Sequence, residues 1–258
     1  SLRENEVMSL KTRFGNLGNI LDFENLTKDN IYVLESPILS NSQFKKFTSF
    51  FKKNLKILDC TFDVQSNLKK GLDQLSLEAE IAVREGCKNI ILSDKKISEK
   101  KVPIPIILAF GAVNSKLVNL GIRGFTSINV QTSEALDTHS LAVLLGVGAT
   151  TINPYLAFDS IYQRYEKKLF GNFNYDKCVK QYIKSVDNGL LKIMSKMGIS
   201  VLSSYRGGCN FEAVGLSRAI VAEYFPGMIS RISGIGIFGI EAKIKTIHKK
   251  AFQKNVSI

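Results

Sequence analysis

Apolar positions follow two different spacings in turn along most of the chain, and this alternation predicts strands separated by helices. Short apolar runs, typical of strands buried on both faces of a parallel sheet, lie at residues 57–62, 89–93, 127–132 and 150–152. Between these runs, apolar residues recur every three or four positions, which predicts helices at residues 68–83, 103–120 and 133–145. Strand–helix–strand units of this kind make right-handed crossovers around a parallel sheet.

The second half of the chain contains a longer helical pattern, which begins at about residue 176 and ends before Gly198. Glycine is the preferred residue where a helix stops in a left-handed conformation. A fifth short strand is predicted at residues 199–202, because this segment is apolar and partly β-branched. Two more amphipathic helices are predicted at residues 44–56 and 240–252.

The number of predicted strands is smaller than the eight that a complete (βα)8 barrel needs, so an α/β fold short of a full barrel is predicted. Residues 1–55 are less regular, and we expect them to link to, or wrap around, the domain formed by residues 56–258. A chain of 258 residues with 45% hydrophobic side chains can bury a substantial core as effectively one domain. No apolar run reaches the length that a membrane span requires.

The net charge of +12 raises the question of a nucleic-acid partner. However, the lysines are scattered in pairs near predicted element ends, and no stripe of arginine interleaved with aromatic residues occurs. Tryptophan is absent from the sequence. We therefore interpret the positive charge as solvated surface, and we expect neither a nucleic-acid nor a membrane partner.

The use of cysteine and histidine excludes several kinds of site. The four cysteines are far apart and form no zinc, iron–sulfur or disulfide pattern: Cys60, Cys87, Cys178 and Cys209. Only 2 histidines are present, which excludes a histidine-rich metal site. Reduced thiols fit the cytoplasm, with the plastid stroma as an alternative. The first residues are polar and lack an initiating methionine, so we expect no secretory signal and a piece of a longer chain.

Candidate chemistry is sought at the carboxyl ends of the strands, where parallel α/β proteins bind their ligands. The polar side chains expected there are Asp59, Asp63, Ser93, Asp94, Gln131, Thr132, Asn153, Tyr155, Ser203, Ser204, Tyr205 and Arg206. No nucleophile, base and orienting group can be assembled from them, so no catalytic residue is predicted. The glycines form no GxGxxG motif after a strand, and no dinucleotide site is predicted either.

The polar turn after the predicted fifth strand has two interpretations. Arg206, Gly207 and Gly208 could hold an anion through the guanidinium group and backbone N–H groups. Alternatively, Ser204, Tyr205 and Arg206 could meet a neighbouring domain. We favour the second interpretation and predict these three residues as a docking surface.

Several sequence blocks occur in an order that resembles one protein family. The blocks are LRENEVMSL at 2–10, LESPILS at 34–40, LDCTFDV at 58–64, PIPIILAFGAV at 103–113, GVGATTINPYLA at 146–157, MSKMGIS at 194–200, SYRG at 204–207, FEAVGL at 211–216 and RISGIGI at 231–237. Together they resemble the central domain of the glutamate synthase large subunit, ferredoxin- or NADPH-dependent, over essentially the whole chain. The chain departs from the family at Gln131 and at His139 and Ser140, where the resemblance implies a carboxylate and paired histidines.

The resemblance implies a rudimentary, incomplete TIM-like barrel without a cofactor or catalytic residue of its own. In this family an upstream amidotransferase domain releases ammonia from glutamine. A downstream domain, which binds FMN and an iron–sulfur cluster, then converts 2-oxoglutarate into glutamate. The central domain joins these two partners and helps to form the ammonia passage near its own start, so Met8 is expected as an apolar wall residue. The alternative hypothesis is a self-sufficient FMN-dependent α/β oxidoreductase.

Overall fold

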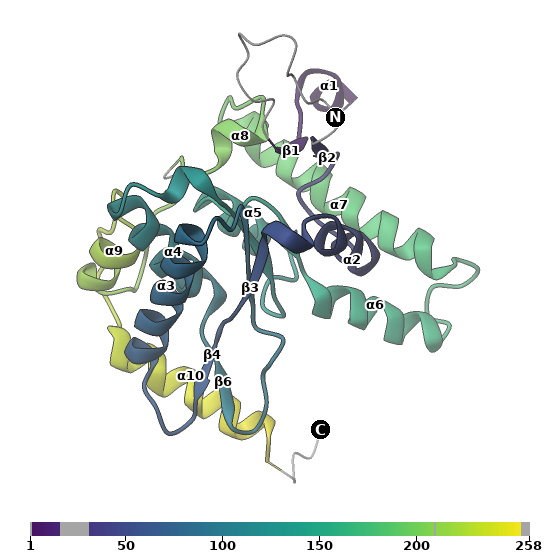
Figure 1. Cartoon of the computed structure of the whole chain (residues 1–258). Helices are drawn as coiled ribbons and strands as arrows, with labels where there is room; N and C mark the ends of the chain where they lie inside the picture. Colours follow the sequence, from purple (N-terminus) through teal and green to yellow (C-terminus); the bar gives the residue numbers. More distant parts are fainter. Residues whose placement is uncertain (1, 16–30, 209, 254–258) are drawn as a thin grey trace, which may run out of the picture.

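A sheet of four parallel strands forms the centre of the molecule (Figure 1). The computed structural model describes residues 2–15, 31–208 and 210–253. The strands lie side by side in the order β3 (Leu55–Asp59), β5 (Asn89–Ser93), β7 (Ser127–Gln131) and β8 (Ile152–Asn153). Leu55 is opposite Asn89, and Asn89 is opposite Ser127, so the amino ends of three strands are level. Their carboxyl ends therefore meet at one edge of the sheet, where residues from different strands can bond.

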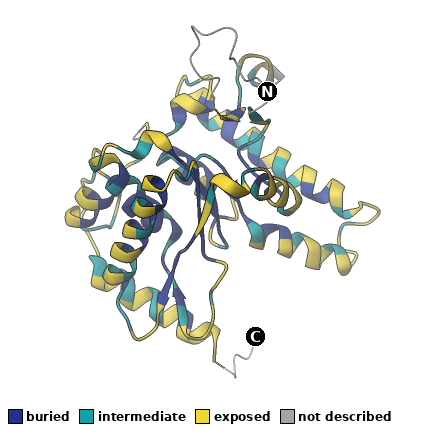
Figure 2. Cartoon of the chain, in the orientation of Figure 1, coloured by how far each residue is buried: buried dark blue, intermediate teal, exposed yellow. Residues whose placement is uncertain are grey.

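Helices connect the strands and cover the sheet. Three of them form the crossovers: α3 (Leu68–Arg84), α4 (Ile106–Asn119) and α5 (Thr138–Gly146). In α3, Leu68, Leu72 and Leu75 lie on one face and are buried. Asn67 begins this helix by accepting a hydrogen bond from the N–H of Lys70 (2.8 Å). Figure 2 shows the result, with buried residues concentrated in the sheet and on the inward faces of the helices.

The other helices of the described residues lie around this sheet and its crossover helices. They are α1 (Leu2–Val7), α2 (Asn41–Phe50), α6 (Tyr155–Glu166), α7 (Tyr175–Lys196), α8 (Leu202–Tyr205), α9 (Arg218–Tyr224) and α10 (Ile237–Ala251). α6 and α7 pack against each other and project from the sheet as an arm (Figure 1). α10 packs on α3, and it lies at the opposite end of the molecule from α1 (Figure 1).

Two small antiparallel pairs accompany the main sheet. β1 (Thr12–Phe14) pairs with β2 (Tyr32–Leu34), and β4 (Thr61–Asp63) pairs with β6 (Lys101–Pro103). Single turns of 3-10 helix occur at η2 (Lys52–Asn54) and η3 (Arg123–Phe125). The first pair contributes to a second hydrophobic cluster, which contains Phe14, Leu34, Leu39, Phe44, Phe47 and Ile91. Several N-terminal residues therefore pack with Ile91 of β5 in a smaller cluster, whereas Leu10 and Ile38 belong to the main core.

The predicted class, parallel βαβ units in an incomplete TIM-like barrel, is confirmed by the four-stranded parallel sheet. The long helix and the C-terminal helix are also confirmed, within a few residues of their predicted limits. The helix expected at 44–56 begins and ends earlier, because Ser40 caps it and strand β3 starts at Leu55. Across the residues that the structure describes, no helix is long and apolar enough to cross a membrane.

The fifth strand predicted at residues 199–202 is wrong. Val201 makes a single parallel bridge with Ser9, and helix α8 begins at the next residue. The N–H of Ser9 donates to the Ser200 carbonyl (2.8 Å), and the N–H of Leu202 donates to the Ser9 carbonyl (3.0 Å). The segment is apolar because it packs on the core within a turn, and its backbone pairs with the N-terminal segment rather than with β8.

The expected start of the helix after β7 is also wrong. The helix was predicted to begin at residue 133, but α5 begins at Thr138 and is capped by Asp137. Glu134 instead accepts a hydrogen bond from the N–H of Ile106 (3.0 Å), at the first turn of α4. A carboxylate near a helix N-terminus is favourable wherever it comes from, and here it serves a neighbouring helix rather than its own.

Candidate functional site

The carboxyl ends of three strands are joined by hydrogen bonds between polar side chains. The hydroxyl of Ser93 donates to the side-chain oxygen of Gln131 (2.8 Å), and the Gln131 amide nitrogen donates to Asn153 (3.1 Å). Asn153 is fully buried and donates in turn to the carbonyl of Leu39 (2.9 Å) and to the side chain of Asn41 (3.0 Å). We call Ser93, Gln131 and Asn153 the carboxyl-edge network. Because its members bind one another, they are not free for a ligand.

Asp94 lies next to this network and is fully buried. Its Oδ2 accepts hydrogen bonds from the hydroxyl of Thr132 (2.7 Å) and from the N–H (2.9 Å) and hydroxyl (3.1 Å) of Ser133. Its Oδ1 has no hydrogen-bond partner among the described residues. The ammonium group of Lys95 lies over the ring of Tyr155, 5.6 Å from its centre, rather than on Asp94. Asp94 thus ties the loop after β5 to the loop after β7.

The other predicted carboxylates at this edge also have local partners. Asp59 accepts a hydrogen bond from the hydroxyl of Thr61 (2.7 Å) and forms an ion pair with Lys96 (3.8 Å). Asp63 accepts a hydrogen bond from the N–H of Gln65 (2.9 Å), as expected for a carboxylate that closes a turn. These contacts stabilise loops, and they account for both side chains without a ligand.

The pKa values of Cys60 and Glu134, near this edge, are shifted. Burial and the negative charge of Asp94 raise the pKa of the Cys60 thiol well above its ordinary value, which makes the thiol a poor nucleophile. Partial withdrawal from water, together with the charge of Asp94, raises the pKa of Glu134 to about 7.

His248, on the C-terminal helix α10, lies away from this edge, and its Nε2 is 2.8 Å from the carbonyl oxygen of Ser98. Within the described ranges, no cluster of His, Cys, Asp and Glu could hold a metal ion.

The turn with the predicted docking residues folds back onto the chain itself. Tyr205 is fully buried, and its hydroxyl donates to the carbonyl of Ala142 (3.2 Å). The guanidinium of Arg206 donates to the carbonyl of Thr150 (3.0 Å) and to the hydroxyl of Thr12. Of the three predicted residues, Ser204 is the exposed one. Cys209, the fourth cysteine, lies outside the described residues.

Arg206 has no carboxylate partner in the part of the chain that the structure describes. Its Nε is buried without a hydrogen-bond partner. Burial and the nearby charge of Arg123 lower the pKa of Arg206 to about 10. Arg123 itself donates to the side chain of Asn114 (2.7 Å) and to the carbonyl of Thr126 (2.7 Å). Both guanidinium groups therefore depend on neutral acceptors.

Met8 lies where the N-terminal segment meets this turn. It is partly buried and packs against the main core. Its neighbour Ser9 forms the bridge to Val201, which fixes the backbone beside Met8. The roles of Ser9 and Thr12 were missed from the sequence. The alternation of buried Leu10, Thr12 and Phe14 with exposed neighbours is the pattern that could have revealed this strand.

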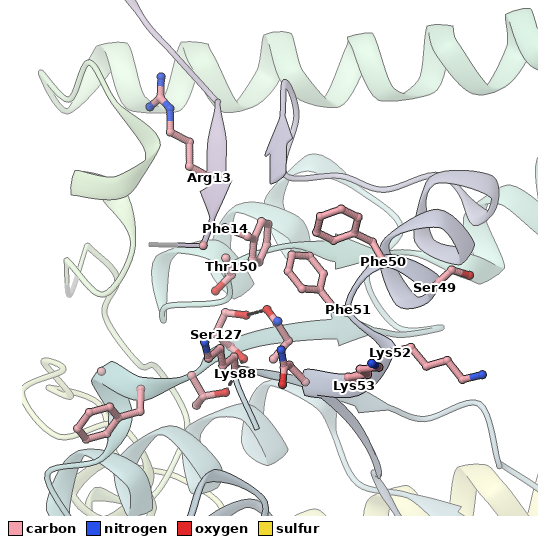
Figure 3. A pocket seen from close by; sticks show the side chains of 16 residues that line it. Arg13, Phe14, Ser49, Phe50, Phe51, Lys52, Lys53, Lys88, Ser127 and Thr150 are labelled. Carbon is pink, nitrogen blue, oxygen red and sulfur yellow. Dashed lines mark hydrogen bonds between the residues drawn. The ribbon is translucent and has the colours of Figure 1, made fainter. Parts of the chain in front are cut away.

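A cavity of ≈ 1020 Å³ lies at the other end of the sheet, beside the amino ends of the strands (Figure 3). Phe14, Phe50 and Phe51 form an aromatic wall, as Figure 3 shows. The charged side chains among the described lining residues are cations, namely Arg13, Lys52, Lys53 and Lys88. Among the described residues of the lining there is no Asp, Glu, His or Cys, so these residues offer no acid, base or thiol for catalysis.

A comparison with protein families matches residues 1–217 to the model described as the glutamate synthase central domain. The chain belongs to this family. The resemblance found in the ordered sequence blocks is therefore confirmed.

Relatives of this glutamate synthase domain include chains named as NADPH glutamate synthases and chains named as ferredoxin-dependent glutamate synthases. The chain is 51% identical to the NADPH glutamate synthase large chain of Azospirillum brasilense and 37% identical to that of Bacillus subtilis. It is 35% identical to the ferredoxin-dependent chloroplastic glutamate synthase of Spinacia oleracea. These matches cover 99%, 100% and 99% of this chain but 17% of each relative, so further parts of the large chain flank this region in the relatives.

Among solved structures, a mutant flavocytochrome b2 with benzoylformate matches at a TM-score of 0.43 and 12% identity. The match covers 82% of the glutamate synthase domain and 49% of that chain. The likeness concerns the fold alone.

Proposed function

We propose that this chain is the non-catalytic central part of a glutamate synthase large chain. It joins an amidotransferase domain to a domain with FMN and an iron–sulfur cluster, in an enzyme that makes glutamate from glutamine and 2-oxoglutarate. The observation that supports a non-catalytic role most strongly is the carboxyl-edge network. At the edge where α/β enzymes hold their substrates, the polar side chains of this chain are bonded to each other.

The same edge does not fit a flavin, which bears on the alternative of a self-sufficient FMN-dependent oxidoreductase. FMN carries a phosphate, and a site for it needs free N–H groups or cations. Here the buried Asp94 places a carboxylate at the edge, Lys96 is paired with Asp59, and Lys95 lies over the ring of Tyr155. The network residues would have to break their own hydrogen bonds to meet the isoalloxazine ring. We therefore assign FMN and the iron–sulfur cluster to the flanking parts of the parent enzyme.

We further propose that Met8 forms part of the wall of the ammonia passage. Such a passage has to exclude bulk water, because ammonia that meets water takes up a proton and no longer acts as a nucleophile. The thioether chain of Met8 is apolar, and it packs on the core beside a backbone that the Ser9–Val201 bridge holds in place. Residues 1–55 in this view wrap the α/β domain and present the passage segment to the upstream domain.

The test is made in the full-length large chain. Met8→Trp would narrow the passage, and we expect glutamine-dependent glutamate formation to fall below that of the parent, because the larger indole side chain obstructs the path of ammonia. Ammonia released from glutamine should then appear in solution, and glutamate formation from added ammonia should persist. Met8→Leu, which keeps an apolar side chain, should behave as the parent. Leu169→Trp, at an exposed position between α6 and α7, is the matched control. Full coupling in Met8→Trp would refute the wall assignment.

For the compartment, we propose the cytoplasm, with the plastid stroma as the alternative. The described cysteines are free, which fits a reducing environment. The relatives include chains named as chloroplastic. Thiol titration of protein isolated without reductant checks the reduced state.

A further inference from the structure

An exposed apolar surface runs along the last part of the chain. It consists of Val214, Ile229, Ile232, Ile235 and Phe238, whose exposed fractions lie between 44% and 83%. We call these five residues the C-terminal ridge. Single exposed apolar residues are common and need no explanation, but a contiguous group marks an interaction site.

Backbone hydrogen bonds bring the segment that carries Val214 beside the segment that carries Ile229, Ile232 and Ile235, and Phe238 follows three residues later in the first turn of α10. The N–H of Ala213 donates to the Ile229 carbonyl (2.8 Å), and the N–H of Gly215 donates to the Ile232 carbonyl (3.0 Å). The N–H of Ile235 donates back to the Gly215 carbonyl (3.0 Å). The two extended stretches therefore lie side by side. Because the side chain of Ala213 is buried, that of Val214 points outward, next to the exposed isoleucines.

Close approach of the two stretches depends on Gly234. A Cβ atom at this position would lie 2.1 Å from the Gly215 carbonyl oxygen, which is far inside van der Waals contact. The ridge is thus a built surface with a fixed backbone. The chain from Arg231 to Ile235 is exposed throughout.

We propose that the C-terminal ridge is the docking surface for the part of the large chain that follows residue 258. The proposal rests on the proposed function, in which this chain is a piece of a longer glutamate synthase chain. The match to the glutamate synthase central-domain family ends at residue 217, so four of the five ridge residues lie beyond the matched region. The relatives nevertheless match through this region, and the matched part is 17% of their length.

Chain connectivity favours the following part over the preceding one. Phe238 lies in the first turn of α10, and this helix of 15 residues is about 22 Å long. The chain therefore leaves α10 within about 22 Å of the ridge, so the part that follows is tethered on the ridge's side of the molecule. The preceding part attaches near α1, at the opposite end of the molecule (Figure 1).

Hydrogen exchange tests the proposal by comparing the 258-residue chain with the full-length large chain. We expect amides of residues 229–240 to exchange about tenfold more slowly in the full-length chain, because the docked domain covers them. Ile232→Asp and Phe238→Asp should each abolish this difference. Neither should change the melting temperature of the 258-residue chain by more than about 2 °C, since both side chains are exposed. Leu169→Asp, exposed on the α6–α7 arm, should leave the difference intact.

Two results would overturn the proposal. One is equal exchange of residues 229–240 in both chains. The other is a dimeric 258-residue chain, measured by light scattering, that Phe238→Asp converts to a monomer, because a second copy would then be the occupant. The Met8 variants report ammonia coupling and these variants report coverage of the ridge, so each proposal can fail while the other stands.

Discussion

The two ends of the central sheet differ in how their polar groups are paired. At the carboxyl edge, Ser93, Gln131 and Asn153 are bonded to one another and buried. At the amino edge, Lys53 and Lys88 border a cavity with an aromatic wall, and no described carboxylate pairs with them (Figure 3). The polar side chains at the carboxyl edge therefore bond to protein groups, whereas Lys53 and Lys88 at the other end are exposed to solvent.

The contrast between the two edges also indicates which polar side chains at strand ends contribute to stability. A buried side chain whose partners are all protein groups contributes to stability, because removing it leaves those partners unpaired. An exposed cation without a partner contributes little, because water already solvates it. The size of a mutational effect should accordingly follow pairing and burial, not position relative to the expected ligand site.

The largest effect is expected at the carboxyl edge. Asn153→Leu removes three hydrogen bonds and leaves the Gln131 amide and the Leu39 carbonyl unpaired in the interior. We expect the free energy of unfolding to fall by about 3 kcal/mol, measured by urea denaturation. Asn119→Leu, at an exposed site on α4, should change it by less than about 0.5 kcal/mol. A loss below about 1 kcal/mol in Asn153→Leu would show that the network is not structural.

An intermediate effect is expected at Arg206. Its guanidinium donates to the carbonyl of Thr150, and Thr150 lines the amino-edge cavity. Arg206→Ala removes the bonds to Thr12 and Thr150, but it also relieves the repulsion from Arg123. The net loss should be about 1–2 kcal/mol, with faster hydrogen exchange confined to residues 9–14. Arg164→Ala, exposed on α6, is the control. Global unfolding of Arg206→Ala, or unchanged exchange at residues 9–14, would contradict this role.

A smaller effect is expected in the pH dependence of the free energy of unfolding, through Glu134 near the carboxyl edge. The pKa of Glu134 is raised from 4.5 to about 7, so the folded chain holds this proton more tightly than the unfolded chain does. Its contribution to stability is full below pH 4.5 and is lost as the pH rises to about 7. Glu134→Gln should flatten the dependence of unfolding free energy on pH in this window. If the unfolding free energy depends on pH in the same way in the parent and in Glu134→Gln, the raised pKa does not belong to Glu134.

The smallest effect is expected at the amino edge. Lys53→Gln and Lys88→Gln remove exposed charges with no ion pair among the described residues. Each should change the free energy of unfolding by no more than about 0.5 kcal/mol in 0.15 M salt. A loss above 1 kcal/mol would mean that these cations are paired after all, and the contrast between the edges would disappear.

Local pattern explains which parts of the fold could be predicted from the sequence. The spacing of leucines in α3 and the apolar runs of β5 and β7 were enough to predict this helix and these strands, because the residues with this spacing are the buried ones. The segment at residues 199–202 has the same apolar character as a strand, but its pairing depends on Ser9, far away in the sequence. Likewise, Glu134 looks like a first-turn residue of its own helix, and only the fold brings it to Ile106.

The candidate site shows the same limit. The positions of Ser93, Gln131 and Asn153 at strand ends were predictable from the strands that precede them. Their mutual bonding was not, because it depends on the register that sets Ser93 opposite Gln131 and Gln131 opposite Asn153. The burial of Tyr205 was missed for a similar reason, since its partner Ala142 lies on another helix.

The central claim, that the carboxyl edge of this sheet is structural and binds no flavin, is tested most directly by titrating the purified 258-residue chain with FMN. The account predicts a colourless protein and no saturable change in flavin absorbance up to about 100 μM FMN, which corresponds to a Kd weaker than about 10⁻⁴ M. A yellow protein with one tightly bound flavin per chain would contradict it.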